Sequence, residues 1–221
     1  MLMLQERELV VEYGKKMSES GLCPGTSGNL SIYDPETGYM AISPSGIDYF
    51  QTTPEDVVIT DLDAHIIEGD RKPSSEWALH TEFYKHKPEA RAVVHTHSLY
   101  CTTLAVLGMP IKAVHYVIGD AGVAEIPCAE YQTFGTVELA QAAMKVCGES
   151  DAVLLGNHGI VVCGKSVESA FGLARNCEYI ARLQYQAMSI GTPNVLNEEQ
   201  MADVMKKFKT YGQPNANKPG Y

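Results

Sequence analysis

Three histidines are placed where their side chains could bind one metal ion. His95 and His97 lie two residues apart at the end of a strand predicted for residues 92–97, and side chains at that spacing in a strand point the same way. His158 follows another apolar segment, in a tight turn flanked by glycines. Three imidazoles with an open fourth position are typical of a catalytic zinc site. Histidines at such positions are also common without a metal, so the spacing alone leaves metal binding open.

A carboxylate and a further histidine belong to the helix that is predicted to open at residues 73–76. Glu76 falls in its first turn, where a negative charge complements the helix dipole, and by itself it is interpreted as a helix-start carboxylate. His80 follows one helical turn later. It is either a partner of a site residue or a core histidine whose ring nitrogens are satisfied by hydrogen bonds, and we favour the core histidine.

The elements that must position these residues alternate along the chain. Amphipathic spacing and turn residues predict helices over residues 6–18, 76–88, 98–107, 136–147, 167–190 and 197–209. Strands are predicted over residues 30–33, 39–43, 57–60, 92–97, 123–128, 152–155 and 160–163. Several of these strands are joined by short turns, which parallel neighbours do not allow. The fold class is therefore α/β, with a mixed, largely antiparallel sheet covered by helices.

Composition limits the partners of the chain. Its 17 Lys and Arg residues against 27 Asp and Glu residues give a net charge of −10, which disfavours nucleic acid because that partner needs cationic side chains. No segment approaches the roughly 18 apolar residues of a membrane span. The six cysteines form no Cys-x-x-Cys pair, as expected of free thiols in a reducing compartment. We expect a cytoplasmic protein that does not contact membranes.

Five motifs, taken in order, resemble those of the zinc-dependent class II aldolase/adducin family. They are the segments 26–29 (TSGN), 43–46 (SPSG), 74–76 (SSE), 95–97 (HTH) and 157–159 (NHG). The resemblance covers nearly all of the chain, from 1 to 221, and implies one domain with a C-terminal arm from about residue 197. It also implies a three-layer α/β/α fold and a homotetramer with active sites at the subunit interfaces.

The resemblance implies a role for individual residues. Zn²⁺ would be held by His95, His97, His158 and Glu76. Glu76 would also act as the catalytic base, and Tyr116 would act as a proton donor in the neighbouring subunit's site. The substrate phosphate would be bound by Ser27, Gly28, Asn29, Ser43, Ser45, Gly46, Ser74 and Ser75. The aldehyde pocket would be shaped by Phe134, Phe208 and Tyr211.

The phosphate assignment agrees with the chemistry of these loops. A dianionic phosphate on a chain of charge −10 needs local donors, and serine hydroxyls with glycine-flanked N–H groups supply them without a lysine. Ser74 and Ser75 also precede a predicted helix, whose free N–H groups and dipole favour an anion.

The reaction that follows is reversible aldol cleavage of a ketose 1-phosphate. The expected substrate is L-fuculose 1-phosphate, which yields dihydroxyacetone phosphate and L-lactaldehyde. No lysine occupies a motif position suited to a Schiff base, so the negative charge left by the broken bond would be stabilised by Zn²⁺.

Two other functions remain open at this stage. A pentulose-phosphate 4-epimerase of the L-ribulose 5-phosphate type would use the same metal site, and Asp120 keeps this alternative in view. A non-catalytic scaffold would keep the fold without the metal. The joint presence of the three histidines and Glu76 argues against a scaffold.

Overall fold

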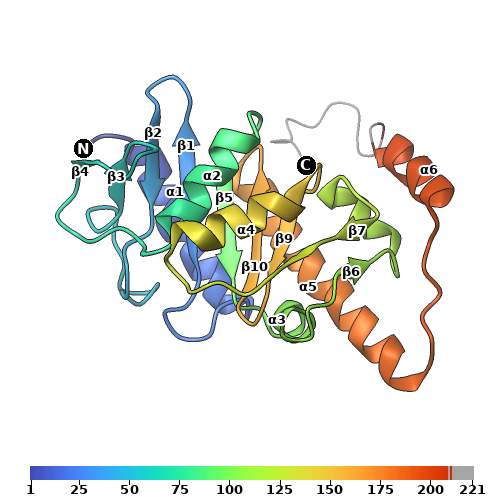
Figure 1. Ribbon diagram of the computed structural model, residues 1–221. Helices are drawn as coiled ribbons and strands as arrows, with labels where there is room; N and C mark the ends of the chain where they lie inside the picture. The colour runs from blue at the N-terminus through green and yellow to red at the C-terminus, as the bar shows by residue number, and fades with distance from the viewer. Residues whose placement is uncertain (209, 211–221) are drawn as a thin grey trace.

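The core of the protein is an eight-stranded sheet, seen in a computed structural model that describes residues 1–208 and 210 (Figure 1). Its strands follow the order β4-β3-β2-β1-β5-β10-β9-β8. All neighbours pair antiparallel except β8 and β9, which run parallel. The strands are β1 (Asn29–Asp34), β2 (Tyr39–Ile42), β3 (Val58–Thr60), β4 (Ile66–Glu68), β5 (Ala92–Thr96), β8 (Cys128–Ala129), β9 (Ala152–Leu155) and β10 (Gly159–Gly164).

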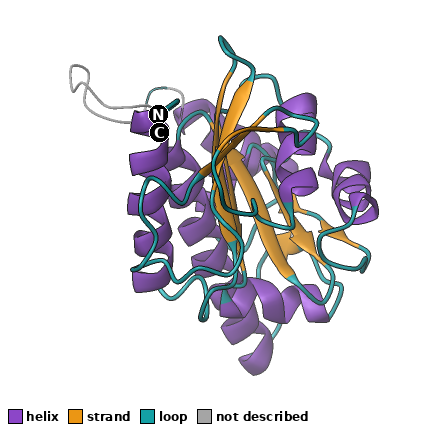
Figure 2. Ribbon diagram, turned by 90° about the vertical axis from the view of Figure 1, so that its left-hand side faces the viewer, coloured by secondary structure: helices purple, strands orange, loops and turns teal. Residues whose placement is uncertain are grey.

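Helices cover the sheet on both faces, so that three layers are visible when the sheet is seen from its edge (Figure 2). One face packs against α1 (Leu4–Glu19), α3 (Leu99–Val106) and α5 (Val167–Ile190). The other face packs against α2 (Trp77–His86) and α4 (Val137–Cys147). The predicted α/β/α fold with a mixed, largely antiparallel sheet is confirmed.

The alternation of side chains along the central strand β5 divides the core into these two halves. In β5, Val94 packs with the residues of α1 and α5, whereas Val93 packs with those of α2 and α4. Because side chains alternate in a strand, His95 lies on the same side as Val93, over α2. The alternation of side chains along β5 therefore places His95 on the side of the sheet that α2 covers.

Helix α5 begins at a capping box, and a further helix follows it. The Ser166 hydroxyl accepts a hydrogen bond from the Ser169 N–H, and the Ser169 hydroxyl accepts one from the Ser166 N–H, a capping box that begins α5 where it was predicted. After α5 the chain turns back and α6 (Glu198–Phe208) packs against a 3₁₀ helix, η1 (Tyr116–Ala121) (Figure 1).

Two local predictions were wrong. The strand predicted for residues 123–128 is divided into β7 (Glu125–Ile126) and β8 by Pro127, which has no N–H to continue a ladder. β7 pairs instead with β6 (Ile111–Lys112) in a small separate sheet. The helix expected to include Glu76 begins at Trp77, so Glu76 is the residue that flanks its start.

No helix in residues 1–208 is both long and apolar enough to cross a membrane. The division of the chain into one domain with an arm stays a prediction.

Candidate metal centre and active site

Four side chains that are far apart in the sequence meet at one end of the central strands. One ligand atom from each of Glu76, His95, His97 and His158 lies within 4.8 Å of the others, and we call these residues the four-residue cluster. The three imidazole centroids are 4.8 or 4.9 Å from one another. Glu76 Oε2 lies 3.2 Å from His95 Nε2, and Glu76 Oε1 lies 3.4 Å from His158 Nε2. The convergence that the sequence motifs imply is present.

Strand pairing explains this convergence. His95 is the next-to-last residue of β5 and the register partner of Val161 in β10, so the turn between β9 and β10 lies beside it and carries His158. Asn157 has a φ of 55° in this turn, a left-handed conformation that asparagine tolerates well. Gly159 packs so closely on β5 that a Cβ would collide with the Thr96 carbonyl oxygen. Glycine at this position lets the turn approach the strand.

The hydrogen bonds within the cluster fit a bound cation. His95 Nδ1 lies 2.9 Å from the Ile160 carbonyl oxygen, which can only accept, so Nδ1 carries the hydrogen and Nε2 has a free lone pair. This Nε2 faces His97 Nε2 at 3.0 Å. Glu76 Oε1 is buried and finds no hydrogen-bond partner in the part of the chain that the structure describes. Lone pairs and an unpartnered carboxylate oxygen directed at one point are what a divalent metal ion requires.

Burial governs the ionisation of these groups. Desolvation, with the neighbouring imidazoles, lowers the pKa of His97 and of His158 to about 4, which keeps both rings neutral at pH 7. For Glu76, burial acts to raise the pKa of the carboxyl, but His95, His158 and the Asn29 amide lower it overall. Neutral imidazoles and an ionised carboxylate are the forms that bind metals.

The four-residue cluster borders a pocket of about 330 Å³, a size that suits a small ligand. Three predicted loops line it together: 26–29, 44–46 and 74–76. Of the eight residues expected to bind phosphate, seven lie here: Ser27, Gly28, Asn29, Ser45, Gly46, Ser74 and Ser75. Their assignment to phosphate itself stays a prediction.

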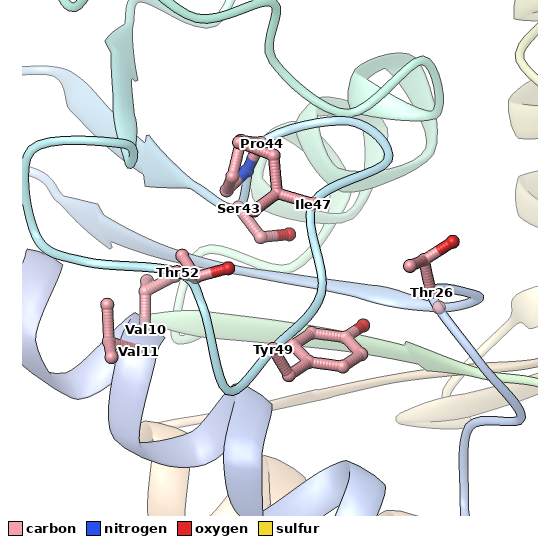
Figure 3. Close-up of a pocket in the computed structure, with 9 residues that line it drawn as sticks. Val10, Val11, Thr26, Ser43, Pro44, Ile47, Tyr49 and Thr52 are labelled. Carbon is pink, nitrogen blue, oxygen red and sulfur yellow. The ribbon is translucent and has the colours of Figure 1, made fainter.

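Ser43 is placed differently from the other seven. It lines a second, smaller cavity of about 10 Å³, next to the first and about the size of one water molecule. Figure 3 shows Ser43 among the side chains of this cavity, with Thr26 and Tyr49. The Ser43 hydroxyl accepts a hydrogen bond of 3.1 Å from the Leu30 N–H, so it also holds the loop against β1.

Gly28 explains why the first loop can pass so close to the cluster. Its φ is 77°, and a Cβ would lie 2.5 Å from Cys23 Sγ and 2.7 Å from the His95 carbonyl oxygen. Only glycine accommodates both the left-handed backbone and this close approach.

Of the remaining predicted residues in the described part of the chain, only Phe134 lines the main pocket. Phe134 is 67% exposed. Tyr116 lies apart from the pocket on η1, with its ring centroid 6.2 Å from that of Phe208 on α6. Tyr211 is outside the described residues. Their functional assignments stay predictions.

Sequence reasoning missed five other pocket residues: Thr26, Pro44, Tyr131, Gln132 and Asn157. Thr26, Pro44 and Asn157 belong to the quoted motifs and could have been chosen as neighbours of site residues. Tyr131 and Gln132 come from the segment after β8, and their types and spacing carry no signal of a site.

Comparison with known proteins shows the family. The sequence model of the class II aldolase and adducin N-terminal domain matches residues 8–185. A 5-deoxy-D-ribulose 1-phosphate aldolase of Bacillus thuringiensis serovar kurstaki is 49% identical, over 96% of this chain and 100% of that protein. An L-fuculose phosphate aldolase of Escherichia coli strain K12 is 39% identical, over 92% of this chain and 94% of that protein.

A solved structure gives the same result. That of an L-fuculose 1-phosphate aldolase superposes with a TM-score of 0.90 at 41% identity, and the match covers 93% of this chain and 96% of that one. The match over both chains, together with a four-residue cluster able to hold the metal ion on which such enzymes depend, shows that this chain is a class II aldolase, a lyase of the class II aldolase and adducin family.

Proposed function

We propose that this protein is a zinc-dependent aldolase that cleaves a terminal-deoxy ketose 1-phosphate into dihydroxyacetone phosphate and a short aldehyde. The observation that supports this most directly is the four-residue cluster, which borders a pocket lined by three serine- and glycine-containing loops. The pocket thus combines a place for a cation with a place for an anion. A cytoplasmic location fits the six free thiols.

Glu76, His95, His97 and His158 would hold the metal. Three imidazoles and one carboxylate form a donor set that suits Zn²⁺. When bound, the cation supplies Lewis-acid stabilisation of the negative charge that develops on the ketose oxygens as the carbon–carbon bond breaks.

The serine and glycine loops would orient the substrate by its phosphate. Ser27 and Ser45 belong to two different loops of the pocket, and Ser74 and Ser75 precede α2. Free N–H groups at this helix start favour an anion. Fixing the phosphate places the scissile bond of the ketose beside Glu76 and not at random within the pocket.

In cleavage, Glu76 would return a proton to the carbon from which the aldehyde departs. In synthesis, it would remove that proton. Its carboxylate is ionised and buried at the pocket floor, which suits a proton acceptor shielded from water. In the reverse direction the aldehyde oxygen needs a proton, and Tyr116 of a neighbouring copy would donate it. We therefore propose a homotetramer whose sites lie between subunits.

The identity of the aldehyde separates two substrates. L-fuculose 1-phosphate, expected from the sequence motifs, would release L-lactaldehyde. The 49% identical relative is named for 5-deoxy-D-ribulose 1-phosphate, which would release acetaldehyde. Both substrates end in a methyl group, for which the exposed Phe134 at the pocket is an apolar contact. The higher identity makes 5-deoxy-D-ribulose 1-phosphate the first substrate to test.

A single assay tests these proposals. The zinc-loaded protein is incubated with 5-deoxy-D-ribulose 1-phosphate, L-fuculose 1-phosphate and L-ribulose 5-phosphate, and dihydroxyacetone phosphate is measured by its enzymatic reduction. We expect release from one or both 1-phosphates and loss of activity after chelation. Conversion of L-ribulose 5-phosphate to its 4-epimer without triose release would instead identify an epimerase, and no turnover of any substrate would refute the proposal.

A further inference from the structure

A chain of buried hydrogen bonds runs from Glu76 into the layer between the sheet and α2. Glu76 Oε2 lies 2.9 Å from Asn29 Nδ2, and Asn29 Oδ1 lies 2.5 Å from His80 Nε2. His80 Nδ1 lies 2.7 Å from the Ser31 hydroxyl, which lies 2.7 Å from the Tyr84 hydroxyl. His80 and Ser31 are fully buried, and Asn29 is only 5% exposed.

The donors from Ser31 to Asn29 all point toward Glu76. A carboxylate only accepts, so the Asn29 amide turns its Nδ2 to Glu76 and its Oδ1 to His80. His80 must then donate from Nε2, which leaves a lone pair on Nδ1 for the Ser31 hydroxyl. The Tyr84 hydroxyl ends the chain, and its one hydrogen can go either to the Ser31 hydroxyl oxygen at 2.7 Å or to the Ser31 carbonyl oxygen at 3.0 Å.

The ring of His80 is neutral, as this arrangement requires. Burial, and to a smaller extent the nearby His95, lower its pKa to about 3, while Glu76 acts in the opposite direction. Each nitrogen of the neutral ring has one hydrogen-bond partner, so neither Asn29 Oδ1 nor the Ser31 hydroxyl is left unpaired.

We propose that His80 is a positioning residue that fixes the orientation of the Asn29 amide and, through it, the rotamer of Glu76. With Oε2 held by Asn29, Oε1 faces His158 and, within residues 1–208, has no hydrogen-bond partner of its own. The two oxygens thus have separate tasks, one anchored and one free for the metal ion. This inference rests on the proposed function only in giving Glu76 a role at the metal.

The alternative is a core histidine that only fills space and has no effect on Glu76. An apolar side chain of similar size would then be acceptable at position 80. In the structure such a side chain would leave Asn29 Oδ1 and the Ser31 hydroxyl unpaired in the core. The Asn29 amide would be free to turn, and its oxygen would then face the Glu76 carboxylate, which repels it.

Two substitutions at His80 separate the alternatives. In His80→Gln the side-chain amide can still donate to Asn29 Oδ1, whereas His80→Leu can donate to nothing. Thr81→Val is the matched control, since Thr81 is the next residue of α2, is equally buried and bonds only to the Ala78 carbonyl. We expect His80→Leu to lower Zn²⁺ affinity and kcat by about 10- to 100-fold, with His80→Gln within a few-fold of the wild type.

The measurements do not all depend on turnover. Zn²⁺ affinity is obtained by titrating the chelator-stripped protein against a chromophoric competitor, and thermal unfolding reports folding. In the metal-free wild type with ¹⁵N-labelled histidine, the His80 resonances, assigned by their loss in His80→Gln, report which ring nitrogen carries the hydrogen. We expect the hydrogen on Nε2 from pH 5.5 to 8.

The outcomes are distinct. A hydrogen on Nδ1, or a His80→Leu variant that loses stability like Thr81→Val but keeps its Zn²⁺ affinity and kcat, would overturn the proposal. So would a His80→Gln variant as impaired as His80→Leu. If the wild type cleaves none of the sugar phosphates, the proposed function fails, while the tautomer and the Zn²⁺ affinities still decide the role of His80.

Discussion

Glu76 is the residue on which the chemistry of this site turns, because its two oxygens have different surroundings. Oε2 contacts the Asn29 amide and His95, whereas Oε1 faces His158 and has no hydrogen-bond partner among the described residues. A carboxylate held at one end and open at the other can bind a cation or accept a proton without rotating out of the pocket.

Replacing Glu76 by Gln tests its role as a proton acceptor. Three imidazoles remain, so the variant should still bind Zn²⁺ when loaded, measured by atomic emission. The amide cannot accept the proton, so kcat should fall by about 10²- to 10⁴-fold. Glu82→Gln is the control, since Glu82 lies farther along α2 and pairs only with the surface residues Lys85 and His86. A Glu76→Gln enzyme with normal turnover would remove Glu76 as the base.

His80 predicts how stability depends on pH in the metal-free protein. Its pKa is about 3 in the folded state against 6.5 ordinarily, so the unfolded state binds a proton that the folded state does not. His80 therefore leaves the free energy of unfolding unaffected above pH 6.5. As the pH falls from 6.5 toward 3, it lowers that free energy by up to about 1.4 kcal/mol per pH unit. Urea unfolding between pH 7.5 and 5 should show a shallower fall for His80→Gln, and equal slopes would contradict the prediction.

At the scale of elements, the turn between β9 and β10 decides where His158 lies. The turn is pressed against the end of β5, and Gly159 has no room for a side chain because of the Thr96 carbonyl oxygen. The same strand carries His95, so any separation of β10 from β5 also separates the histidines.

Gly159→Ala should therefore affect both stability and the metal site. Overpacking against backbone should cost about 1–3 kcal/mol in the free energy of unfolding and weaken Zn²⁺ binding. Gly172→Ala serves for comparison, because Gly172 lies within α5 with no atom near its would-be Cβ and alanine should stabilise that helix by about 0.5–1 kcal/mol. Chemical unfolding and Zn²⁺ titration of both variants measure this, and an unchanged Zn²⁺ affinity in Gly159→Ala would show that the turn does not position His158.

At the scale of the whole molecule, the separation of Tyr116 from the pocket has a consequence. Tyr116 is 50% exposed on η1, beside α6, and does not line the pocket of its own chain. If it donates a proton in catalysis, as proposed, it must do so in the pocket of another copy. Each active site would then be built from two chains.

Mixing two inactive variants tests this arrangement. Tyr116→Phe and Glu76→Gln should each be nearly inactive alone. When the two are co-expressed, random assembly should restore about a quarter of the sites, which then combine an intact Glu76 with an intact Tyr116. The mixed protein is purified by two different affinity tags and assayed for triose release. Activity no higher than that of the two separate variants would place Tyr116 outside the neighbouring site.

Much of the local structure could be predicted from the sequence. The period of two in residues 92–97, the helix over residues 167–190 and the glycine-flanked turns depend on near neighbours in the chain, and the structure agrees with them. The division of the predicted strand at Pro127 was missed although proline is itself a local signal. Motif order was also enough to indicate the family, which the comparisons show.

By itself, then, the sequence determined most of the elements, the fold class and the residue types able to hold a metal, because these follow from spacing along one strand or helix. Only the tertiary structure decided that Glu76, His95 and His158 converge, that Ser43 lies in the smaller cavity and that His80 reaches Glu76 through Asn29. The contacts of Asn29 with Glu76 and with His80 join residues 47 and 51 positions apart. Strand order and register, which no local pattern encodes, determine which distant side chains meet.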